Sequence, residues 1–197
     1  GRSYEIQRFF PAVGTNDYPR DAARTALEIH EGNPGDKPAE ADILIFMPGK
    51  RETEAVVELL TKANWGYKKP GAAVGPFCLL AISRDEIVAQ SRDFRLLAAA
   101  PGDLRVAGEG GLVRPVRRII VATVVAETGL TLAALKYVID CGWSRSLVTY
   151  FPGGFSGLVT TPAPQSRILQ RMGRSGRLFP GQFFPLYTKK VFEMLPA

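Results

Sequence analysis

The segment ADILIFMPGKR, residues 41–51, decides the fold of this chain. Its apolar run, residues 42–47, is typical of a strand that is buried on both faces. Pro48 and Gly49 then turn the chain into residues 50–63, where apolar side chains recur with helical spacing. A buried strand that leads straight into a helix indicates one unit of an α/β sheet.

Similar apolar runs recur along the chain, and helical patterns separate several of them. The other predicted strands are residues 4–10, 77–82, 118–123, 136–140 and 182–187. A further helix is predicted at residues 17–30, with Asp17 as its N-cap, and another begins at Gln165. This alternation predicts an α/β fold, a parallel sheet flanked by helices with right-handed crossovers. We expect residues 1–197 to form a single domain, excised from a longer chain.

Three segments do not follow the alternation. Residues 147–151 and 157–161 flank a Pro-Gly-Gly sequence at 152–154, and this pattern predicts a β-hairpin. Residues 66–76 and 101–115 are rich in glycine and proline, and we expect them to be surface loops.

The composition suits a polyanionic partner and an intracellular location. Lys and Arg number 25 against 19 Asp and Glu, which gives a net charge of +6. The two cysteines, Cys78 and Cys141, lie in apolar runs, so we expect buried, reduced thiols rather than a disulfide framework. The chain has no apolar run of 18 residues and no secretory signal, so no membrane partner is expected. The nucleus and the cytoplasm are not distinguished.

The segment QRMGRSGR, residues 170–177, carries the clearest chemistry. Arginine forks make bidentate, charge-assisted hydrogen bonds to phosphate oxygens, and glycines allow a close approach of the backbone. Arg174 and Arg177 are three residues apart and are expected to share one helix face, whereas Arg171 points elsewhere and serves structure. The alternative is a solvated basic face that binds nothing in particular.

Ligands of an open parallel sheet gather at the carboxyl ends of its strands. We expect three segments there: residues 47–51, whose amides and Lys50 suit a nucleic-acid phosphate, residues 122–131, which carry several hydroxyls, and the arginine-rich segment. The chain has no GxxxxGK[ST] phosphate loop and no acidic pair after a strand to hold Mg²⁺. It therefore looks like the arginine-supplying half of a nucleotide site.

The order of these motifs resembles the second RecA-like domain of DEAH-box (DExH) RNA helicases, which belong to helicase superfamily two. Residues 41–54 resemble motif IV, residues 121–132 resemble motif V, and KYVIDCG at 136–142 is similar to the strand that follows it. Residues 170–177 match motif VI, QRxGRxGR, and Pro180-Gly181 with Leu186-Tyr187-Thr188 resembles the segment that closes the domain. The resemblance implies a RecA-like sheet from which the predicted hairpin projects, a feature that the family associates with strand separation.

The resemblance also implies an ATP site between this domain and a partner RecA-like domain. The partner would carry the phosphate loop and the DEAH box and would hold most of the Mg²⁺. By position, Arg174 and Arg177 would be the arginine fingers, and Gln170 would orient the attacking water. The residues implied to contact the nucleotide or to couple motif V to it are Phe94, Glu127, Gly129 and Thr131.

RNA is the second partner that the resemblance implies, with adaptor proteins as further candidates. Gly49, Lys50 and Thr123 would contact the RNA backbone. The whole protein would be an ATP-dependent RNA helicase, and the isolated domain is expected to be inactive.

Motif V departs from the family pattern at several positions, so a second reading stays open. Val124-Val125 replaces the usual Asn-Ile, Gly129 replaces a serine, and Ala133 stands where an aspartate is common. The alternative is a catalytically inactive RecA-like module that binds RNA or protein as a scaffold. A preference for DNA over RNA also stays open.

Overall fold

The computed structural model describes residues 4–37, 40–82, 92–123, 132–150 and 154–197. Its centre is a six-stranded parallel sheet in the order β1-β10-β7-β2-β6-β3. The strands are β1 (Ile6–Arg8), β2 (Asp42–Phe46), β3 (Cys78–Ile82), β6 (Arg118–Ala122), β7 (Leu135–Asp140) and β10 (Gly181–Pro185). The α/β prediction is confirmed, and each strand lies inside or within one residue of its predicted range.

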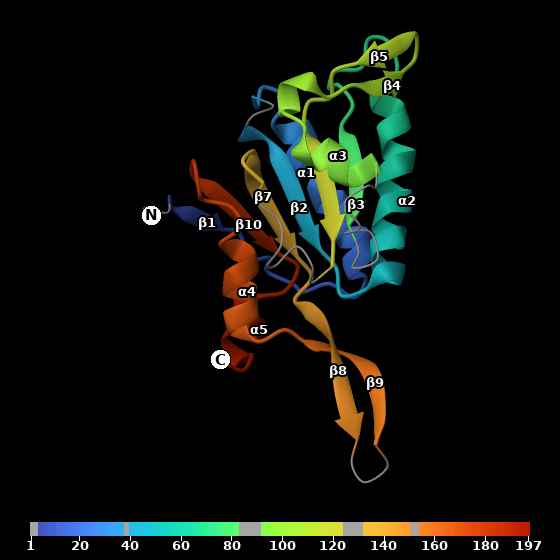
Figure 1. Cartoon of the computed structure of the whole chain (residues 1–197). Coiled ribbons are helices and arrows are strands. Elements are labelled where there is room, and N and C mark those ends of the chain that lie inside the picture. The colour runs from blue at the N-terminus through green and yellow to red at the C-terminus, as the bar shows by residue number, and fades with distance from the viewer. Residues whose placement is uncertain (1–3, 38–39, 83–91, 124–131, 151–153) are drawn as a thin grey trace.

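Helices cover both faces of this sheet (Figure 1). They are α1 (Tyr18–Gly32), α2 (Lys50–Tyr67), α3 (Arg92–Ala98), α4 (Gln165–Met172) and α5 (Lys189–Met194). Along the fully buried strand β2, Ile43 and Ile45 pack in one core with the buried residues of α1 and α2. Leu44 and Phe46 point to the other face and pack in a second core with residues of α3, α4 and α5. Burial on both faces explains why the strand reads as an unbroken apolar run.

The first two helices begin where the sequence predicted them. Asp17 Oδ1 accepts a hydrogen bond of 3.2 Å from the amide of Arg20, so Asp17 is the N-cap of α1, as predicted. Helix α2 begins at Lys50, as predicted, and continues to Tyr67, which shortens the predicted loop at 66–76.

The predicted loop at 101–115 is wrong in part. After a 3₁₀ turn at Pro101–Asp103, β4 (Val106–Gly108) and β5 (Gly111–Val113) form a small antiparallel hairpin. Gly110 and Gly111 adopt φ values of +97° and +136°, which a tight reversal needs and which only glycine reaches without strain. The glycines that suggested a loop are therefore the turn of a hairpin.

The predicted hairpin at 147–161 is confirmed, and it is longer than expected. Strands β8 (Trp143–Tyr150) and β9 (Phe155–Pro162) pair antiparallel along their full length. The hairpin extends from the edge of the sheet at which β7 ends, away from the body of the domain (Figure 1). Leu147 and Leu158 face each other across it and are 66% and 64% exposed.

Two buried ion pairs fix opposite ends of the sheet. Arg118, the first residue of β6, binds Asp42 at 2.6 Å and also donates to carbonyl oxygens of Leu96, Leu97 and Ala99 at the end of α3. At the carboxyl end of the sheet, Arg171 of α4 binds Asp140 of β7 at 2.7 Å. All four of these side chains are at most 3% exposed. Each arginine thus ties a helix to the end of a strand.

Both cysteines are buried thiols, as predicted. Burial raises the pKa of Cys141 to about 12, so its thiol stays protonated at neutral pH. Within the described ranges, no helix is both long enough and apolar enough to cross a membrane.

His30, in the last turn of α1, is part of the buried core. Its side chain is fully buried, its ring meets Tyr67 and Phe77 edge to face, and Nε2 lies 2.9 Å from the carbonyl oxygen of Gly75. A carbonyl oxygen only accepts, so Nε2 carries the proton of a neutral ring. Burial, aided by the charge of Arg117, lowers the pKa of His30 to about 4.

We predict that the stability of this chain falls as the pH falls through the range set by His30. The unfolded imidazole takes up a proton near its ordinary pKa of about 6.5, whereas the folded ring resists protonation until about pH 4. The unfolded state therefore binds more protons in this interval, and the free energy of unfolding should drop by about 2 kcal/mol between about pH 7.5 and pH 5. Urea titrations at several pH values measure this.

His30 is the only histidine in the sequence, which makes His30→Gln a clean control. The variant should be less stable than the unmodified protein at neutral pH. Between about pH 7.5 and pH 5, however, its free energy of unfolding should fall by about 2 kcal/mol less than that of the unmodified protein. An equal slope in both proteins would contradict the assignment.

Candidate functional site

The turn after β2 and the end of β6 lie side by side at the carboxyl edge of the sheet. The two strands are neighbours with Phe46 opposite Ala122, and the amide of Met47 donates to the carbonyl oxygen of Ala122 at 2.9 Å. Thr123 follows at once, half-buried, with its amide bonded to the carbonyl oxygen of Ile82 at 3.2 Å. Gly49, Lys50 and Thr123 therefore lie at the edge where the sequence predicted them.

Lys50 is available to an anionic ligand. It is the first residue of α2, and its ammonium group lies 3.9 Å from Glu54 Oε1, with 70% and 66% of the two side chains exposed. An ion pair that is so long and so exposed holds the ammonium weakly.

Arg145 of β8 is a second cation at this edge, and the sequence prediction missed it. A Cβ atom at Gly49 would lie 2.8 Å from Arg145 Nη1 and 2.9 Å from Glu52 Oε2. Gly49 has φ −157°, which any residue adopts, so the absence of a side chain is what admits the guanidinium. Within the described part of the chain, the structure gives Arg145 no ion pair or hydrogen bond of its side chain. The hairpin was predicted to begin at residue 147, which left Arg145 outside it.

The prediction that Arg174 and Arg177 share a helix face is wrong. Helix α4 ends at Met172, and Gly173 is its C-cap. The amide of Arg174 then donates to the carbonyl oxygen of Arg171 at 3.1 Å, and Gly176 adopts a φ of +70°. A glycine in this left-handed conformation takes the chain out of the helical path. Arg174 is half-buried, whereas Gln170 and Arg177 are exposed.

The expectation that residues 170–177 lie at the carboxyl edge holds for Arg171, which binds Asp140 there, but is wrong for the residues that follow α4. The carbonyl oxygen of Gly176 accepts from the amide of Tyr4 at 2.7 Å, before β1 begins. A Cβ atom at Gly181, the first residue of β10, would lie 2.5 Å from Ser175 Oγ. The chain must return to the amino ends of the strands before β10 can run parallel to β7, and α4 with the turn after it makes this return. We call residues 173–177 the arginine segment.

Arg171 has the structural environment that the sequence predicted. Its Nη1 donates to Asp140 Oδ1 at 2.7 Å, and its Nη2 donates to the carbonyl oxygen of Trp143 at 3.1 Å. Its guanidinium also lies 5.3 Å from the ring centroid of Phe46. The second carboxylate oxygen of Asp140 accepts from the hydroxyl of Tyr187 at 2.7 Å, and burial together with this carboxylate raises the pKa of that hydroxyl.

A model of the helicase conserved C-terminal domain matches residues 112–179, which include Arg145, α4 and the arginine segment. All of the chain matches the putative RNA helicase B962L of African swine fever virus, with 49% identity over 200 residues. It also matches the human probable ATP-dependent RNA helicase DHX35, with 32% identity over 197 residues.

This chain is a C-terminal helicase domain of the DEAH-box class. The crystal structure of the DEAH/RHA helicase HrpB of Escherichia coli covers all of it, with a TM-score of 0.71 and 26% identity. The domain spans 20% of the viral relative, 25% of the human relative and 22% of the HrpB chain.

Several predicted nucleotide contacts of this helicase domain cannot be located. Glu127, Gly129 and Thr131 lie outside the described residues. Phe94 belongs to α3, but its side chain is outside the described part as well. Among the described residues, no group of three or more His, Cys, Asp or Glu side chains is arranged to hold a metal ion.

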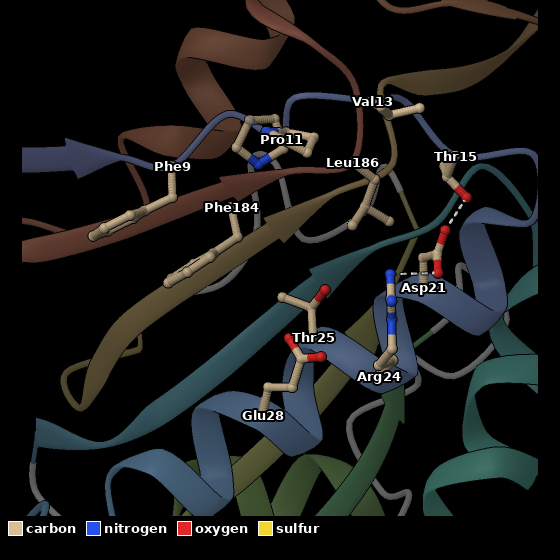
Figure 2. Close-up of a pocket in the computed structure, with 11 residues that line it drawn as sticks. Phe9, Pro11, Val13, Thr15, Asp21, Arg24, Thr25, Glu28, Phe184 and Leu186 are labelled. Carbon is tan, nitrogen blue, oxygen red and sulfur yellow. Dashed lines mark hydrogen bonds and ion pairs between the residues drawn. The ribbon is translucent and has the colours of Figure 1, made fainter.

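A cavity of about 250 Å³ between α1 and the end of β10 is separate from these surfaces (Figure 2). Phe9 and Phe184 stack on one side of it at 4.8 Å, and Asp21 on the other side binds both Thr15 and Arg24. None of the predicted site residues lines this cavity.

Gly142 connects the end of β7, where Asp140 binds Arg171, to the start of the hairpin. We predict that Gly142→Ala strongly destabilises the fold. Gly142 has φ +80°, and a Cβ atom there would lie 2.5 Å from Cδ1 of Tyr187. Backbone strain and the clash together should lower the free energy of unfolding by about 3 kcal/mol.

Gly154 provides the matched control for this substitution. It has a similar φ of +67°, but nothing lies within 4 Å of the position that its Cβ would take. Gly154→Ala should therefore cost about 1 kcal/mol, the backbone part alone. Urea unfolding measures both free energies of unfolding. Equal losses of stability in the two variants would show that the clash with Tyr187 contributes nothing.

Proposed function

We propose that this domain is the second motor domain of an ATP-dependent RNA helicase. The observation that carries the proposal is a division of the candidate cationic side chains between two surfaces. Lys50 and Arg145 lie at the carboxyl edge of the sheet, whereas Arg174 and Arg177 lie beyond α4, beside the start of β10. A motor that couples a nucleotide to a nucleic acid needs two such surfaces. The names of the viral and human relatives, both RNA helicases, support the choice of RNA.

The nucleotide surface consists of Gln170, Arg174 and Arg177. ATP would lie between this surface and a partner RecA-like domain that carries the phosphate loop, the DEAH box and most of the Mg²⁺ ligands. Arg174 and Arg177 would donate to the β- and γ-phosphates only when the two domains close, and Gln170 would orient the attacking water. Because the arginines act across a cleft, hydrolysis would depend on domain closure. Phe94, Glu127, Gly129 and Thr131 stay proposed contacts of the same nucleotide.

The RNA surface consists of Gly49, Lys50, Thr123 and Arg145. Lys50 and Arg145 would neutralise backbone phosphates, and the amide that begins α2 and the hydroxyl of Thr123 would add hydrogen bonds. Contacts of this kind read no bases, so binding would tolerate many sequences and weaken with salt. We further propose an intracellular protein that works with adaptor proteins.

In the full-length protein, Arg174→Ala should lower RNA-stimulated ATP turnover by about a thousandfold, since a trans-acting arginine finger contributes on this order. RNA affinity should be unchanged, because Arg174 is not on the RNA surface. Arg114→Ala removes an exposed arginine near the amino end of β6 and serves as the control. Full turnover in Arg174→Ala would end the arginine-finger assignment, and no turnover in the unmodified protein would favour the scaffold alternative.

Lys50→Ala and Arg145→Ala should each weaken the binding of single-stranded RNA roughly fivefold, since each removes a partly solvated phosphate contact. Each should also reduce the slope of log affinity against log salt by about 0.7, the value for one phosphate contact on a single strand. Fluorescence anisotropy with a labelled oligonucleotide at several salt concentrations measures both quantities.

Arg114→Ala is again the matched control, because it removes the same charge from the opposite edge of the sheet. A loss of affinity that is equal in all three variants would mean that only net charge matters. The proposed RNA surface would then be wrong.

A further inference from the structure

The guanidinium group of Arg171 lies between the two proposed surfaces. It meets Phe46, Asp140 and Trp143, which are the last residue of β2, the last residue of β7 and the first residue of β8. Lys50 follows Phe46 by four residues, and Arg145 follows Trp143 by two. One side chain thus contacts both chain segments that carry the cations of the RNA surface.

The backbone of Arg171 contacts the arginine segment. Its carbonyl oxygen accepts from the amide of Arg174 at 3.1 Å, in the turn that ends α4. The far end of the arginine segment is fixed separately, because Gly176 bonds to Tyr4 and lies against Ile6. A shift of Arg171 would therefore change the turn that orients Arg174 while the other end stays in place.

Only an arginine satisfies both of the side-chain hydrogen bonds. Its planar fork donates to Asp140 and to the carbonyl oxygen of Trp143 with two different nitrogens. Lysine would keep the charge, but its compact ammonium group cannot reproduce the spacing of this fork. A lysine here would therefore keep the pair with Asp140 and lose the bond to the hairpin.

We infer that Arg171 is a positioning residue that links the hairpin and the RNA surface to the arginine segment. The inference rests on the proposed function. When RNA or strand separation displaces β8, the carbonyl oxygen of Trp143 moves, and the guanidinium bonded to it moves with it. The turn from Arg171 to Arg174 then follows, so that the position of the hairpin influences the arginine that faces ATP.

The test is the number of base pairs separated per ATP hydrolysed, measured on one RNA duplex with the full-length protein. Arg171→Lys should lower this ratio by about threefold or more, in the range of the coupling energies that connected residues show. Arg118→Lys is the control, because Arg118 is also a buried arginine that binds an aspartate and backbone carbonyls, at the opposite edge of the sheet. Both variants should lose similar stability, and Arg118→Lys should keep the ratio of the unmodified protein.

A milder pair of variants covers the case in which the lysine variants do not fold. Phe46→Leu keeps an apolar side chain but removes the ring beside the guanidinium, and Phe183→Leu changes an equally buried ring of the same core. Phe46→Leu should lower the ratio, and Phe183→Leu should not. Ratios that match their controls in the variants that fold would overturn the inference. An unmodified protein that neither hydrolyses ATP nor separates strands would instead refute the proposed function, and the inference would fall with it.

Discussion

The parallel direction of all six strands is the constraint on which the rest of the structure depends. Each connection between consecutive parallel strands has to carry the chain back along the sheet, and helices do this most economically while covering its faces. The turn that follows β2 and the end of β6 consequently meet at one edge. The arginine segment ends a return path, so it arrives at the other end of the sheet. The strand topology therefore places the proposed RNA surface and the proposed nucleotide surface at different ends of the sheet.

The core of this fold could be predicted from the sequence because burial on both faces leaves an unmistakable pattern. Strand β2 is buried at every position, and its apolar run is unbroken. Helices α1 and α2 begin where a cap or a turn was visible at Asp17 and Gly49. The short helices α3 and α5 and the β4–β5 hairpin were not predicted, because elements of a few residues show too little periodicity to separate them from loops.

The candidate site was predictable in its residue types but not in its geometry. The spacing of Arg174 and Arg177 suggested a helix face, yet the left-handed Gly176 between them ends that possibility. Arg145 was missed because its approach to Gly49 is a tertiary contact that no local pattern records. His30 is a similar case, since the carbonyl that it binds is 45 residues away in the chain. The roles of Gln170, Arg174 and Arg177 come from the family resemblance alone.

The hairpin β8–β9 has a mechanical consequence that follows from its length. Each strand has eight residues, so the ribbon reaches about 27 Å from its base at the usual rise per residue. A tilt of about 10° at Trp143 would displace the far end by nearly 5 Å, by the geometry of a lever of that length. Conversely, a load applied at the tip acts on the base with a large torque. The residues around Trp143 therefore bear the stress of whatever the hairpin touches.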